Sequence, residues 1–169
     1  GGPHHPRRPR GGPVDLTERI NLAYGLDWTA TPARLTARDR LDADLVVSCV
    51  DTAAARRDIG AAIGSNGGYW LDLGNRATDG QIVLGQPETR GARPAQPRLP
   101  TVLERFPELA DPAFVEDDAP SCSLAAALER QSLFINRTIA AMALAMLYQL
   151  LARGSIDYAG LYVNLASGL

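Results

Sequence analysis

One acidic residue of this chain stands where an α/β protein would place a ligand. Asp51 follows the apolar run Leu45–Val50, which is typical of a strand covered on both faces. In open α/β sheets, ligands bind beyond the carboxyl ends of the strands. The Asp51 carboxylate could hold Mg²⁺ against the phosphates of a nucleotide, or it could cap the helix that follows, with Thr52 as the alternative cap. Position alone leaves both roles open.

Four further side chains are candidates for chemistry. Arg56 and Arg57 lie in the first turns of the helix after Asp51, where arginine could contact phosphate, although a solvated helix face is the commoner arrangement. Cys122 precedes a predicted helix whose N-terminus would favour a thiolate, but acids precede it and no histidine is near, which favours a packing role. Cys49 lies inside the apolar run and is predicted to belong to the core.

The composition excludes several classes of site. All 17 basic residues are arginine, and both histidines lie in the first few residues. Without lysine there is no Walker-type phosphate loop, and the body has no imidazole for base catalysis or metal binding. The net charge of −2 does not indicate a nucleic acid or an anionic membrane as partner. The longest apolar run, Ile139–Leu151, is too short to span a bilayer, so a cytoplasmic location is expected.

The order of predicted elements indicates an α/β fold. Residues 1–13 contain only Gly, Pro, His and Arg and are predicted to form a disordered leader. The elements predicted after it are a helix from Val14 that ends at Gly25, a strand in Trp28–Leu35, strand Leu45–Val50, helix Ala53–Ile63, strands Tyr69–Leu73 and Gln81–Leu84, helix Ser123–Arg153 and strand Ile156–Leu165. This alternation of strands and helices predicts a largely parallel sheet.

Several motifs, in order along the chain, resemble the ThiF/MoeB/ubiquitin-activating superfamily. The segment Asp44–Asp51, followed by Arg56, resembles its D-x-V-x-D-C-x-D-N-x-x-x-R pattern. The segments that resemble the ThiF-related family of the bacterial PRTRC cassette are Tyr69–Asn75, Leu99–Thr101, Asp118–Leu124 and Phe134–Asn136. The likeness runs from about Thr17 to the C-terminus. It implies a Rossmann-like, ThiF-type nucleotide-binding fold with a mostly parallel sheet, of which residues 14–169 would be the C-terminal portion.

The resemblance also implies an activity. Such proteins are adenylyltransferases, which use MgATP to adenylate the C-terminal carboxylate of a ubiquitin-like or sulfur-carrier protein and release pyrophosphate. Asp51 matches the aspartate that binds the metal, and Arg56 matches the arginine on the helix after it. Pro120–Ser123 resembles the P-x-C-T segment of eukaryotic relatives, so Cys122 becomes a candidate acceptor of the acyl group as a thioester. The resemblance further implies a homodimer, and neither nucleic acid nor membrane is expected as a partner.

The chain also departs from the family pattern. No Gly-x-Gly-x-x-Gly loop precedes Val14, and the ribose-binding acid and the zinc-binding CxxC pairs are missing, so the fold is expected to be incomplete at its N-terminus. Because that loop's amides would cradle phosphate, we expect the chain as given to bind ATP poorly, and micromolar binding of MgATP would contradict this. The missing loop also argues against an NAD-dependent enzyme. The alternative reading is a non-catalytic, dimerising interaction module of the same fold.

Overall fold

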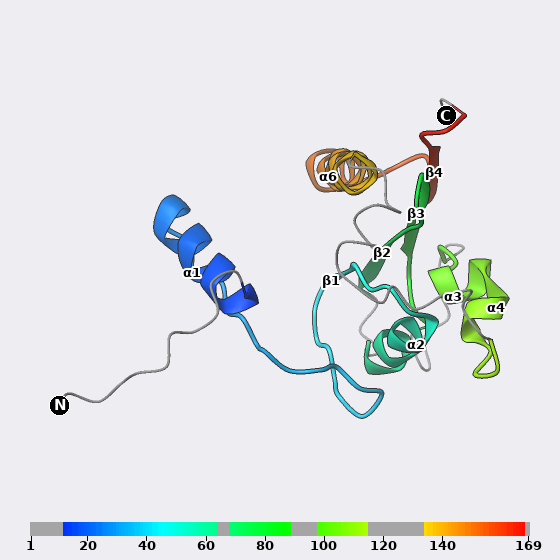
Figure 1. The fold of residues 1–169 in the computed structure, drawn as a ribbon, viewed down its shortest axis with the longest axis horizontal. Helices are drawn as coiled ribbons and strands as arrows, with labels where there is room; N and C mark the ends of the chain where they lie inside the picture. The colour runs from blue at the N-terminus through cyan, green and yellow to red at the C-terminus, as the bar shows by residue number, and fades with distance from the viewer. Residues whose placement is uncertain (1–11, 64–67, 89–97, 115–133, 168–169) are drawn as a thin grey trace. The chain divides into compact units, whose positions relative to one another are not determined.

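The computed structural model describes residues 12–63, 68–88, 98–114 and 134–167 (Figure 1). The chain divides into two compact units, Gly1–Arg34 and Leu35–Leu169, and each is described by itself. The first unit contains helix α1 (Pro13–Tyr24), which starts on a proline and ends at Gly25 in the left-handed conformation, with φ of 64°. Proline suits the first helical position, and glycine suits a left-handed cap, so the predicted helix and its end are confirmed.

The strand predicted over Trp28–Leu35 is wrong. The segment has no regular secondary structure. The side chain of Asn21 accepts a hydrogen bond from the Trp28 amide at 2.9 Å and donates one to the Trp28 carbonyl at 2.8 Å. These are the backbone groups through which a strand would pair, so Trp28 is held back against α1 instead of entering a sheet.

The second unit is built on a four-stranded mixed sheet. Its strands are β1 (Leu45–Ser48), β2 (Tyr69–Asn75), β3 (Asp79–Gly85) and β4 (Gly160–Asn164), in the order β1-β2-β3-β4. Only β1 and β2 are parallel, while β2–β3 and β3–β4 are antiparallel. The prediction of a mostly parallel, Rossmann-like sheet is therefore wrong.

The length of one connection explains this correction. A parallel pair needs a crossover of about a dozen residues or more, whereas an antiparallel pair needs only a tight turn. Strand β2 ends at Asn75 and β3 begins at Asp79, so these two strands can pair only as a hairpin. Between β1 and β2 the chain has room for helix α2 (Ala53–Ala62), which makes the one parallel crossover.

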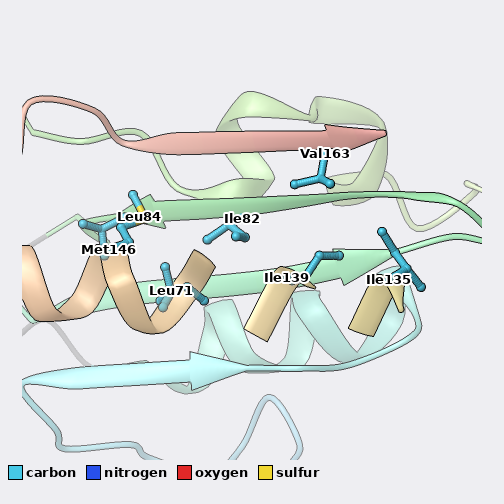
Figure 2. Packing of buried hydrophobic residues seen from close by; sticks show 8 residues of the cluster. Leu71, Ile82, Leu84, Ile135, Ile139, Met146 and Val163 are labelled. Carbon is cyan, nitrogen blue, oxygen red and sulfur yellow. The ribbon is translucent and has the colours of Figure 1, made fainter. Parts of the chain in front are cut away.

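Helices cover both faces of the sheet (Figure 1). Helix α6 (Ile135–Arg153) packs on one face, and α2, α3 (Val102–Arg105) and α4 (Pro107–Ala110) pack on the other. Figure 2 shows the core between α6 and the sheet. Its buried residues are Leu71, Ile82, Leu84, Ile135, Ile139, Ala143, Met146 and Val163.

Strand β1 is less buried than its composition predicts. It is the terminal strand of the sheet within the described residues, and Val47 is 48% exposed. The strand ends at Ser48, and Cys49 beyond it is exposed, so the prediction that Cys49 belongs to the core is wrong. An apolar run of this kind is typical of a strand covered on both faces, whereas β1 remains open to solvent at Val47.

Helix α6 starts later than the helix predicted over Ser123–Arg153, whose first part lies outside the described residues. It ends at Gly154, which is left-handed with φ of 69°. By length and composition alone, α6 could cross a membrane, a criterion that the core helices of soluble proteins also meet, and 22% of the apolar window is buried in the unit.

Candidate functional site

Asp51 lies exposed just beyond the carboxyl end of β1. Because β1 and β2 are parallel, with Ser48 beside Asp72, the carboxyl ends of both strands lie at one edge of the sheet. Helix α2 begins at this edge. Its N-cap is Thr52, whose Oγ1 accepts a hydrogen bond from the Ala55 amide at 3.2 Å. Thr52 therefore takes the capping role, and the carboxylate of Asp51 lies at the surface where a ligand could meet it.

Arg56 comes from the same helix but does not lie on a solvated face. It is 6% exposed, and its Nε donates to Oδ2 of the fully buried Asp72 at 3.0 Å. The other oxygen of Asp72 accepts from the Ser48 hydroxyl at 2.6 Å. Ser48 in turn accepts from the indole Nε1 of Trp70 at 2.8 Å. These four side chains form a buried hydrogen-bonded chain, which we call the Asp72 network.

Strand geometry places the Asp72 network. Alternate residues of a strand point to the same face, so Trp70, Asp72 and Gly74 all face α2. At Gly74 a Cβ atom would come within 2.8 Å of Nη2 of Arg56. The guanidinium therefore extends from Asp72 over Gly74, toward the end of the sheet where Asp51 lies, and only a glycine leaves room for it.

The electrostatics of this edge disfavour Cys49 as a nucleophile. Cys49 is exposed overall, but partial desolvation beside the sheet raises the pKa of its thiol, and the negative charge of Asp72 raises that pKa further. A raised thiol pKa means less thiolate at neutral pH, and the thiolate is the reactive form. Cys49 is therefore a neutral neighbour of the Asp72 network.

Arg57 has a structural role. Its Nη1 donates to the backbone carbonyls of Leu109, at 2.8 Å, and Asp111, at 3.1 Å. These carbonyls lie at the end of α4, where backbone acceptors lack helical partners. Arg57 thus ties α2 to α4.

A concave region lies away from Asp51, on the α2 and α3 side of the sheet. This hollow of about 240 Å³ is lined by Gly60, Trp70, Pro87, Glu88, Thr101, Leu103 and Glu104. Glu104 is paired with Arg98 and accepts from the Thr101 amide, and the pKa of Glu104 falls to about 2, chiefly because of the Arg98 hydrogen bond. Glu104 thus serves the ion pair and the capping of α3.

The carboxylate of Asp51 is a ligand that suits a hard cation. Within the described residues no group of three or more His, Cys, Asp or Glu side chains could enclose a metal. A closed zinc site therefore has no basis there. Mg²⁺ is commonly bound by one or two carboxylates, with water and substrate phosphates completing its shell, and Asp51 fits that manner of binding.

The structure describes two of the three predicted site residues, Asp51 and Arg56. Asp51 is exposed beyond β1 and Arg56 is buried against Asp72, while Cys122 lies outside the described residues, so the roles of all three stay predictions. Sequence reasoning missed Ser48, Asp72 and Gly74. Asp72 did leave a signal, because a single acid inside an apolar strand must find a partner when it is buried.

No known protein family and no curated protein matches this chain. The chemistry of the site therefore rests on the residues and the geometry described above.

Proposed function

We propose that this chain supplies the metal- and phosphate-binding edge of an adenylyltransferase of the ThiF type. The observation that carries the proposal is an exposed acid, Asp51, between β1 and α2, together with Arg56 of α2, which Asp72 of the parallel neighbour β2 holds in place. A carboxyl edge shared by two neighbouring strands requires that they run parallel, and β1 and β2 of the mixed sheet do so. The substrate by resemblance is the C-terminal carboxylate of a ubiquitin-like or sulfur-carrier protein.

In the proposed reaction the carboxylate oxygen of the carrier protein attacks the α-phosphorus of ATP. The bond between that phosphorus and the bridging oxygen breaks, and pyrophosphate leaves with the electron pair. Mg²⁺, when bound, offsets charge on the phosphates. Asp51 would hold the metal, and the Nη atoms of Arg56 would donate hydrogen bonds to a phosphate oxygen. Because Asp72 is bound at Nε, the Nη atoms are the groups through which Arg56, which is 6% exposed, would have to meet a phosphate.

The first test is binding of MgATP followed by nuclear magnetic resonance. We expect weak binding, in the millimolar range, with amide shifts centred on Asp51 and the start of α2, and we expect Asp51→Asn to abolish the dependence on Mg²⁺. Since Asp51 is exposed, the substitution should leave the melting temperature unchanged.

Asp44→Asn is the matched control, because Asp44 is an exposed acid at the amino end of the same strand. It should bind MgATP as the unmodified chain does. Shifts that avoid the carboxyl edge, or Mg²⁺ dependence that survives in Asp51→Asn, would rule out the metal-binding role.

A different observation favours a second candidate, a non-catalytic module that dimerises. Leu144, Tyr148 and Leu151 of α6 are 67%, 73% and 75% exposed, and their spacing places them on one side of the helix, away from the core. Exposed apolar patches of this kind often mark interaction surfaces.

Light scattering tests this candidate. It predicts a dimer that Leu151→Glu dissociates, whereas Ala145→Glu, at an exposed position of α6 off the apolar stripe, leaves it intact. A chain that is monomeric at high concentration would exclude the module.

A further inference from the structure

The partners of Asp72 determine how the arginine at the proposed site presents its charge. Both carboxylate oxygens of Asp72 are engaged, one by the Ser48 hydroxyl and one by Nε of Arg56. Asp72 thus meets the guanidinium at Nε, and the Nη2 atom extends over Gly74. The acid and the arginine are 0% and 6% exposed, so they form a buried pair whose charges cancel.

The charges at the edge can then be summed. Arg56 contributes one positive charge, Asp72 cancels it, and the exposed Asp51 adds a negative charge just before the helix that carries Arg56. An oxyanion without a metal would meet hydrogen-bond donors at Nη but no net positive charge. An oxyanion that carries a divalent cation would meet both the donors and the carboxylate of Asp51.

We propose that Asp72 is a positioning residue that restricts this edge to phosphate groups in complex with a divalent cation. It holds the Nη atoms of Arg56 where a phosphate can reach them, and it removes the net charge that would otherwise attract metal-free anions. The proposal rests on the function proposed above and extends it to the selection of the ligand form.

Gly74 leaves the space that the guanidinium of Arg56 occupies. A side chain there would collide with Nη2 of Arg56, at 2.8 Å from its Cβ, without touching the ion pair at Nε. Gly74→Ala should therefore displace the donors that contact phosphate and preserve the cancellation of charge. This substitution therefore tests the position of the Arg56 donors while Asp72 still neutralises the charge of Arg56.

The experiment is calorimetric titration of the full chain with inorganic pyrophosphate, with and without Mg²⁺. In the unmodified chain Mg²⁺ should tighten binding at least about tenfold. In Asp72→Asn the charge of Arg56 is no longer cancelled, so binding of metal-free pyrophosphate should strengthen about tenfold and the preference for the magnesium complex should shrink. General damage to the fold would weaken binding of both forms, which is the opposite result for the metal-free form.

Gly74→Ala keeps the proposal testable if Asp72→Asn does not fold. It should weaken binding of the magnesium complex about tenfold while the Nε–H signal of Arg56 stays protected from exchange with solvent. Gly12→Ala is the control, because a Cβ at Gly12 meets nothing within 4 Å, and it should bind as the unmodified chain does.

The outcomes separate the two proposals. If Asp51→Asn removes Mg²⁺-dependent binding of ATP but neither Asp72→Asn nor Gly74→Ala changes the response to pyrophosphate, the role of Asp72 is overturned and the proposed function stands. Equal affinity of the unmodified chain for pyrophosphate with and without Mg²⁺ would also overturn it. Selective binding of magnesium pyrophosphate, lost in these variants, supports the role even if ATP is not a ligand.

Discussion

At the scale of single residues, a buried acid organises the edge of the sheet that the exposed acid would use. Asp72 satisfies the Ser48 hydroxyl and the Arg56 guanidinium together, and within the described residues no buried side-chain nitrogen or oxygen lacks a partner. Removing one member of a buried ion pair typically costs about 3–5 kcal/mol, because the other charge stays buried without compensation. The Asp72 network is therefore part of the fold as well as part of the candidate site.

The thiol of Cys49 gives a residue-scale prediction. Because partial desolvation and the charge of Asp72 raise its pKa above the ordinary value of 9.0, Cys49 should react with iodoacetamide more slowly than a model thiol at about pH 8. The measurement is the alkylation rate in a Cys122→Ser background, followed against pH. A midpoint at or below that of the model thiol would contradict the prediction.

The sequence allowed part of this site to be predicted. Asp51 and Arg56 were identified from position and from the family resemblance; Asp51 lies exposed beyond β1 as expected, whereas Arg56 is buried against Asp72, and their roles stay predictions. The partner of Arg56 could not be predicted. The pairing joins α2 to Asp72 across a parallel strand pair, and its register is fixed by tertiary packing, not by local spacing.

At the scale of elements, the start of α3 is fixed by charge. Thr101 and Glu104 form a capping box, and Arg98 binds the same carboxylate. The ion pair of Arg98 and Glu104 thereby joins the segment before α3 to the first turn of that helix. Since the acid lies in that turn, the positive end of the helix dipole also favours its charged form.

The depressed pKa of Glu104 predicts how stability depends on pH. The group titrates near 4.5 when unfolded and at about 2 when folded, so its contribution is complete above pH 4.5 and is lost as the pH falls toward about 2. The side chain is 41% exposed, so we expect a contribution of about 1 kcal/mol, well below the full linkage value.

Urea unfolding at about pH 6 and about pH 2.5 measures this contribution. The unmodified chain should lose about 1 kcal/mol more between the two conditions than Glu104→Gln does. Glu108→Gln, an exposed acid in α4, should behave as the unmodified chain. Equal losses in the chain and in Glu104→Gln would show that the ion pair contributes nothing.

At the scale of the whole second unit, the sheet topology was only partly encoded in local pattern. Apolar runs predicted strands near β1, β2, β3 and β4, and these strands exist with shifted ends. Their directions follow from what joins them. The short connection between β2 and β3 already required an antiparallel pair, whereas the direction of β4 depends on how the chain returns after α6, which no local pattern specifies.

The mixed sheet has a consequence for the order in which the protein folds. The β2–β3 hairpin forms the centre of the sheet, and its pairing closes only a short turn, so little chain entropy opposes it. Joining β1 requires docking of the α2 crossover, and joining β4 requires closing the long segment from Gly85 to Gly160. The hairpin is thus the natural nucleus for folding, and the edge that carries Asp51 takes shape only when β1 docks afterwards.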